Sequence, residues 1–89
     1  MNYSFPINES WTTDEVIKVV ECLAIVEKTY QQVVPAKQIL EKYNSFKQVI
    51  TSKSEEKAIG RRFERETGYS LYKTIQQAKE KADGMVRMT

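Results

Sequence analysis

Apolar positions recur at steps of three and four residues through most of the chain, the periodicity of helices that each bury one side. The first such stretch runs from Val16 to Tyr30. It follows Thr12-Thr13-Asp14-Glu15, a capping-box pattern in which the side chains at both ends satisfy free backbone amides. Trp11 precedes the cap and Val16 falls at the fourth helical position, a spacing that favours a structural clamp for the indole. A first helix is therefore predicted to begin directly after Thr12.

Three further helical segments follow the first. Pro35 suits the first turn of a helix, and apolar residues then recur through residues 36–50. A second capping-box pattern, Ser52-Lys53-Ser54-Glu55, opens a third segment that ends at Thr67-Gly68, and Gly60 weakens its middle. Ser70 can cap a fourth helix that runs through residue 82.

Four helices with short connections predict an all-α fold, a compact antiparallel bundle of three to four helices in a single domain of 89 residues. Val33 and Val34 are interpreted as a break between helices without a strand. Residues 1–10 are expected to form an extended N-terminal segment, and residues 84–89 a frayed tail after Gly84. The first helix is apolar on more than one face, which predicts a central position and leaves self-association open.

Composition excludes the common reaction centres. The chain has no histidine and a single cysteine, so it cannot build the usual zinc sets or a Ser-His or Cys-His nucleophile. Its three glycines form no phosphate-cradling loop. We therefore expect no enzyme, no catalytic or metal-binding residue and no cofactor, and we expect Cys22, inside an apolar run, to be a small buried hydrophobe.

The acidic pairs Asp14/Glu15 and Glu55/Glu56 are adjacent in sequence, so their side chains diverge by about 100° on a helix. Both pairs fall in first helical turns, where negative charge stabilises the helix dipole. The N-terminus has neither a basic start nor an apolar run, and no stretch reaches membrane-spanning length. A cytoplasmic protein without membrane contact is expected.

The strongest candidate surface lies on the third segment. Its cations recur at four-residue steps, with one more beside them, and form a winding basic stripe: Lys53, Lys57, Arg61, Arg65 and Arg62. Like charges at this spacing repel and lower helix stability, so the arrangement is unusual unless carboxylates of a neighbouring helix or an anionic partner answer these cations. The four glutamates of the same segment reduce its net charge to +1, a weak excess for a nucleic-acid site. A solvated face, a protein-docking surface and a nucleic-acid surface all remain open.

A second candidate is the turn Gly68-Tyr69-Ser70-Leu71-Tyr72-Lys73, which carries two tyrosines three residues apart. Tyr69 and Tyr72 could anchor a partner, because each combines a large apolar ring with a polar tip. They could equally pin the turn onto the core.

Several short motifs occur together along the chain: Tyr3-Ser4-Phe5-Pro6, Trp11 with Asp14-Glu15, Val26-Glu27-Lys28 with Tyr30, Tyr43 with Phe46-Lys47, Ser52-Lys53 with Glu55-Glu56-Lys57, Phe63-Glu64, and Gly68-Tyr69-Ser70 with Tyr72-Lys73. In this order the chain resembles the YktA-like family (UPF0223) of small uncharacterised proteins from low-GC Gram-positive bacteria. The resemblance implies an all-helical fold in a bacterial cytoplasm and carries over no activity, ligand or partner. Family members often have glycine where this chain has Val33 and proline where it has Thr51.

The leading hypothesis is a non-catalytic helical protein that acts through protein-protein interaction. Its candidate surface comprises Lys53, Lys57, Arg61, Arg62, Arg65, Tyr69 and Tyr72. The alternative is a weak RNA- or DNA-binding protein that uses the basic stripe.

Overall fold

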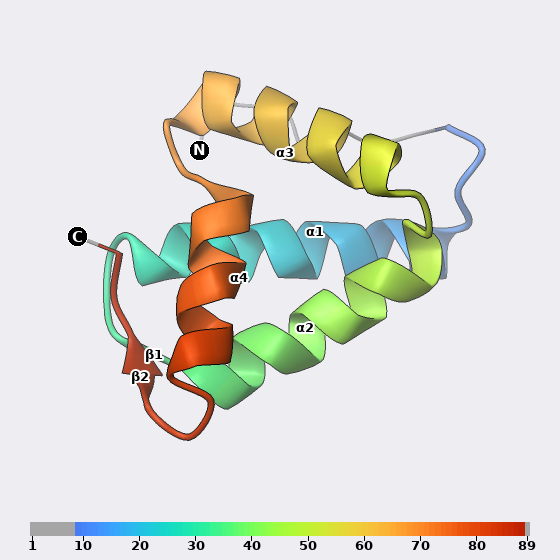
Figure 1. The fold of residues 1–89 in the computed structure, drawn as a ribbon. Coiled ribbons are helices and arrows are strands. Elements are labelled where there is room, and N and C mark those ends of the chain that lie inside the picture. The colour runs from blue at the N-terminus through green and yellow to red at the C-terminus, as the bar shows by residue number, and fades with distance from the viewer. Residues whose placement is uncertain (1–8, 89) are drawn as a thin grey trace.

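Residues 9–88 are described by a computed structural model, in which they form four helices and one pair of two-residue strands (Figure 1). The elements follow in the order α1 (Thr13–Thr29), β1 (Val34–Pro35), α2 (Ala36–Val49), α3 (Lys53–Thr67), α4 (Leu71–Glu80) and β2 (Met85–Val86). The predicted all-α architecture is confirmed. The fourth helix ends two residues earlier than its apolar pattern predicted.

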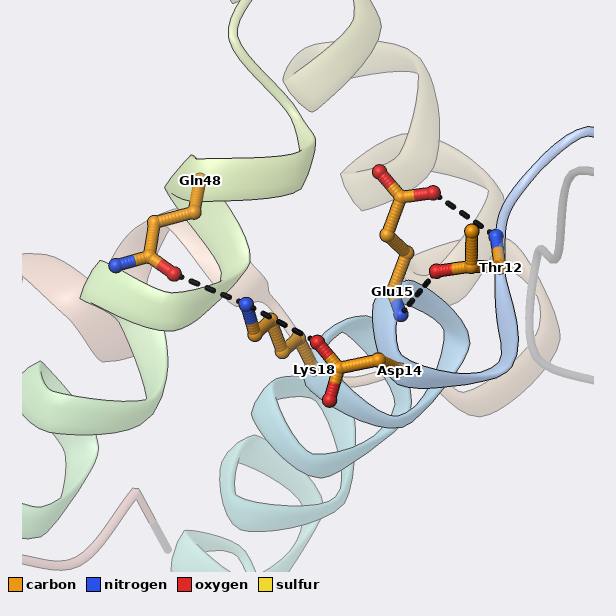
Figure 2. Close-up of polar contacts among 5 residues, drawn as sticks. All are labelled: Thr12, Asp14, Glu15, Lys18 and Gln48. Carbon is orange, nitrogen blue, oxygen red and sulfur yellow. Dashed lines mark hydrogen bonds and ion pairs between the residues drawn. The ribbon is translucent and has the colours of Figure 1, made fainter.

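The start of α1 is held by the predicted capping box (Figure 2). The Glu15 amide donates to Thr12 Oγ1 at 3.2 Å, and the Thr12 amide donates to Glu15 Oε1 at 2.9 Å. Lys18 Nζ lies 3.3 Å from an Asp14 carboxylate oxygen and donates to Gln48 Oε1 of α2 at 3.1 Å. Glu15 therefore caps the start of α1, and Asp14 pairs with Lys18. Lys18 in turn connects the first turns of α1 to the last turns of α2.

Helix α1 lies at the centre of the domain. Val19, Cys22, Leu23 and Val26 are fully buried on it, and residues of every other helix join the same core cluster. Figure 1 shows α2 running back along α1 in the opposite direction, α3 lying on another side of α1, and α4 crossing in front of it. The wide apolar surface of α1 is thus largely used inside the fold. Trp11 also packs against this core, which agrees with a clamping role.

The β1/β2 pair corrects two predictions. Val34 pairs with Val86 and Pro35 with Met85 in an antiparallel register, so the segment after α1 is not a simple helix connection. The tail is not frayed through Met88, because Val86 is 1% exposed and the Met88 amide donates to the Thr29 carbonyl at 2.8 Å. Two-residue strands separated by some fifty positions carry no local periodicity, so only the folded chain brings them together.

Most of the N-terminal segment lies outside the residues that the structure describes. Of the predicted extended segment at residues 1–10, only Glu9 and Ser10 are described, and they form a turn. Thr89, the last residue of the predicted tail, is likewise outside the described residues.

Candidate docking site between α3 and α4

A pocket lies between the middle of α3 and the first turn of α4. Its volume is 390 Å³, which falls within the range of small ligand sites. Two elements supply its lining: Glu56, Lys57, Gly60, Arg61 and Glu64 from α3, and Ser70, Leu71 and Tyr72 from the cap and first turn of α4. The pocket therefore brings together a buried apolar side chain, Leu71, and a tyrosine that is 70% exposed, Tyr72.

The turn that joins the two helices is held by local bonds on both sides. Gly68 ends α3 in the left-handed conformation, at φ 81°, which favours glycine. The Ser70 hydroxyl then caps α4 by accepting the Lys73 amide at 3.1 Å. These two ends set the direction in which α4 leaves α3 and so position the pocket.

Tyr69 fastens this turn to α1. Its ring stacks on Tyr30 with a centroid separation of 4.4 Å and lies tilted against Phe63 at 6.4 Å. The Tyr30 hydroxyl accepts the Ser70 amide at 3.0 Å. Tyr69 therefore packs against the core, as in the structural alternative. Of the two tyrosines singled out in the sequence, only Tyr72 lines the pocket.

The basic stripe is divided by the structure. Lys57 and Arg61 line the pocket, whereas Arg62 lies 3.7 Å from Glu66 in an ion pair one helical turn away. Lys53 and Arg65 are exposed at the two ends of α3, outside the pocket lining. Within residues 9–88, the side chains of Lys53, Lys57, Arg61 and Arg65 form no ion pair. Among the described residues, no carboxylate of a neighbouring helix forms an ion pair with the stripe, and Arg62 pairs with Glu66 of α3 itself.

Glu56 of the pocket lining also contacts Tyr43 of α2. The Tyr43 hydroxyl of α2 donates to Glu56 Oε2 at 2.9 Å, and the ammonium groups of Lys47 and Lys79 lie 5.4 and 5.6 Å from the centre of the Tyr43 ring. Burial, followed by the hydrogen bond and the charge of Glu56, raises the pKa of Tyr43 well above its ordinary value. The sequence predicted for Glu56 only a stabilising effect on the dipole of α3. The contact with Tyr43 was missed because the two residues are thirteen positions apart and lie on different helices, which leaves no periodic signal.

Cys22 has the environment expected from its apolar neighbours. It is fully buried, and burial together with the negative charge of Glu56 raises the pKa of its thiol to about 12. The thiolate is the nucleophilic form, so this cysteine is chemically quiet in the folded protein.

No group of three or more acidic or cysteine side chains in the described part of the chain is placed to hold a metal ion. Among the same residues, no helix has the length and apolar composition needed to cross a bilayer. Of the second acidic pair, the Glu55 backbone amide donates to the Ser52 hydroxyl at 3.3 Å, and the Glu56 carboxylate accepts the Tyr43 hydroxyl.

Sequence comparison decides the family. The model of the uncharacterised protein family UPF0223 matches residues 2–87. The chain belongs to UPF0223. Among UPF0223 relatives, the protein of Streptococcus uberis is 48% identical over 83 residues, covering 93% of this chain and 90% of its own length. The UPF0223 proteins of Streptococcus sanguinis and Streptococcus gordonii are 46% and 48% identical over 87 residues, covering 98% of this chain and 95% of their own lengths.

Proposed function

We propose that this UPF0223 protein is a cytoplasmic, non-catalytic docking protein that binds another protein through the pocket between α3 and α4. The observation that carries the proposal is the exposure of Tyr72 at the mouth of this pocket, beside the buried Leu71. Aromatic rings next to an apolar depression dominate the binding energy of many protein interfaces. A buried thiol of raised pKa is compatible with a reducing compartment and with a protein that performs no thiol chemistry.

The nucleic-acid alternative rests on the unpaired cations of α3. Lys53, Lys57, Arg61 and Arg65 could contact phosphates, and such binding would weaken steeply with salt. The lining carboxylates Glu56 and Glu64 lie among these cations and would repel a phosphate backbone. We therefore favour a protein partner.

Self-association is a third candidate. Ile17 on α1 and Met85 on β2 are about half exposed, at 48% and 49%, and each could contribute to a contact between copies. Sedimentation at micromolar concentration tests this directly, since a strict monomer would remove it.

The test is a tagged purification at native expression level from the bacterial source, with and without nuclease, followed by mass spectrometry. We expect a stoichiometric protein that survives nuclease and is lost from the Tyr72→Ala variant. Val33→Ala is the control, because it shortens a half-exposed apolar side chain away from the pocket. If the Tyr72→Ala variant still binds the partner, the docking surface lies elsewhere on the protein. Associates that disappear with nuclease would replace the proposal by the nucleic-acid alternative.

A further inference from the structure

The charges that line the pocket are balanced. Its cations are Lys57 and Arg61, and its carboxylates are those of Glu56 and Glu64. A face with equal numbers of both charges gives no preference for a ligand of one sign. Such a face can instead match a second copy of itself across a two-fold axis, because the cations of each copy can then face carboxylates of the other.

The order of the charges along α3 fits an antiparallel contact between two α3 helices. The helix spans Lys53–Thr67, so two copies overlap over nearly their full length when the axis passes near the bond between Gly60 and Arg61. Lys57 and Glu64 lie at equal distances in sequence on either side of this bond. The axis therefore sets Lys57 of each copy opposite Glu64 of the other, in two equivalent pairs.

The same register answers a second cation of α3. Glu56 and Arg65 are also equidistant from the axis, so Arg65 of each copy faces Glu56 of the other. A carboxylate accepts several hydrogen bonds, so the bond from Tyr43 does not occupy Glu56 completely. Within residues 9–88, Lys57 and Arg65 form no ion pair in a single copy. Two of the cations that repel one another along α3 thus find carboxylates on a neighbouring molecule.

Apolar area lies on the same face. Tyr72 is 70% exposed beside the buried Leu71, and it is the only aromatic ring among the exposed large hydrophobic side chains of residues 9–88. Gly60 has no side chain, so Arg61 of the second copy can lie across it. A two-fold contact removes both Tyr72 rings from water, which supplies the hydrophobic part of the binding energy.

We infer that a second copy of this chain covers the pocket when no partner is bound, in a two-fold dimer with antiparallel α3 helices. The inference rests on the proposed function in taking the pocket as a docking site. It adds a regulation of that site, because a dimer that covers the pocket excludes the partner. The pairs of Lys57 with Glu64 and of Glu56 with Arg65 set the register, and Tyr72 supplies the apolar contact.

A charge swap tests the register. In the dimer, Lys57→Glu sets two carboxylates opposite each other and Glu64→Lys sets two ammonium groups opposite each other, so each variant repels its own copies. A dimer with one chain of each variant restores attraction in both pairs. Lys37→Glu is the control, because it makes the same change of charge as Lys57→Glu at an exposed position in the first turn of α2, outside the pocket lining.

Sedimentation equilibrium at micromolar concentration should show a monomer-dimer equilibrium for wild type. The dissociation constant should rise roughly tenfold or more in Lys57→Glu, in Glu64→Lys and in Tyr72→Ala, and should change by less than about twofold in Lys37→Glu. An equimolar mixture of Lys57→Glu and Glu64→Lys should dimerise about as tightly as wild type. Circular dichroism first shows that each variant is folded.

The outcomes separate this inference from the function beneath it. A strict monomer, a dimer insensitive to both charge reversals, or a mixture that stays monomeric would overturn the inference. Docking at the pocket would still stand if the tagged purification lost its partner in Tyr72→Ala. A dimer that follows the charge swap, together with a partner that Tyr72→Ala retains, would support the second copy as occupant and overturn the proposed function.

Discussion

The hydroxyl of Tyr43 on α2 and the carboxylate of Glu56 on α3 are joined by a hydrogen bond of 2.9 Å. The ring of Tyr43 is 5% exposed, whereas Glu56 is only half-buried and also lines the pocket between α3 and α4. A single contact thus ties the second helix to the third and joins the core to the candidate docking site. A charged acceptor makes such a bond stronger than a neutral one.

Replacing Tyr43 by phenylalanine should lower the free energy of unfolding by about 1 kcal/mol, because it removes the donor and leaves Glu56 to water. Urea denaturation measures the change. Tyr72→Phe is the control, since it deletes a hydroxyl from a largely exposed ring and should shift stability by less than about 0.5 kcal/mol. Equal effects of the two variants would show that the Tyr43 bond contributes little.

The raised pKa of Tyr43 predicts a loss of stability in alkali. Above the ordinary tyrosine pKa of 10.0, the phenol ionises in the unfolded chain while it stays protonated in the folded one. The unfolded state then binds fewer protons, so stability falls as the pH rises. Between pH 9.5 and roughly 11, the free energy of unfolding of wild type should decline more steeply than that of Tyr43→Phe. Parallel curves would contradict this assignment.

Cys22 should resist alkylation in the folded protein. Its thiol is fully buried and has a pKa of about 12, against an ordinary value of 9.0, so almost no thiolate is present at pH 8. We expect the rate of reaction with iodoacetamide to be more than roughly a hundredfold lower in buffer than in denaturing urea. Mass spectrometry of the modified chain gives both rates. Rapid labelling of the folded protein would show that the thiol is accessible.

Gly60→Ala should stabilise the protein by up to about 1 kcal/mol, because Gly60 lies inside α3 and alanine is the better helix former. The added methyl would meet Leu71 at 3.7 Å, an ordinary contact. The same methyl narrows the pocket, so the yield of the partner in the tagged purification should fall while the melting temperature rises. Gly68→Ala should instead destabilise by about 1 kcal/mol, since its φ of 81° is strained for alanine.

The β1/β2 pair can be tested with two neighbouring residues of β2. Val86 is 1% exposed, and Val86→Ala should lower the free energy of unfolding by about 2 kcal/mol through lost burial and an incompletely filled cavity. Met85 is 49% exposed, and Met85→Ala should change it by less than about 0.5 kcal/mol. Thermal or urea unfolding decides the matter. A frayed tail would make both substitutions neutral.

Local signals in the sequence determined the four helices and most of their ends. The Thr12 capping box, the Ser52 and Ser70 caps and the Gly68 stop all act within a few residues of the chain, and the structure has each of them. The burial of Cys22 also followed from its apolar neighbours. Such features can be predicted because the interacting groups lie within one helical turn or one face of a helix.

Tertiary structure alone decided the strand pair, the contact between Tyr43 and Glu56, and the division of the basic stripe. Each depends on how whole helices cross, which neighbouring residues do not specify. The direction in which α4 leaves the Gly68 turn places Tyr72 beside Lys57 and Arg61, whereas Arg62, next in sequence, pairs with Glu66 outside the pocket. Arg61 and Arg62 are successive residues of one helix and point about 100° apart, so the packing of α4 against α3 places only Arg61 in the pocket lining.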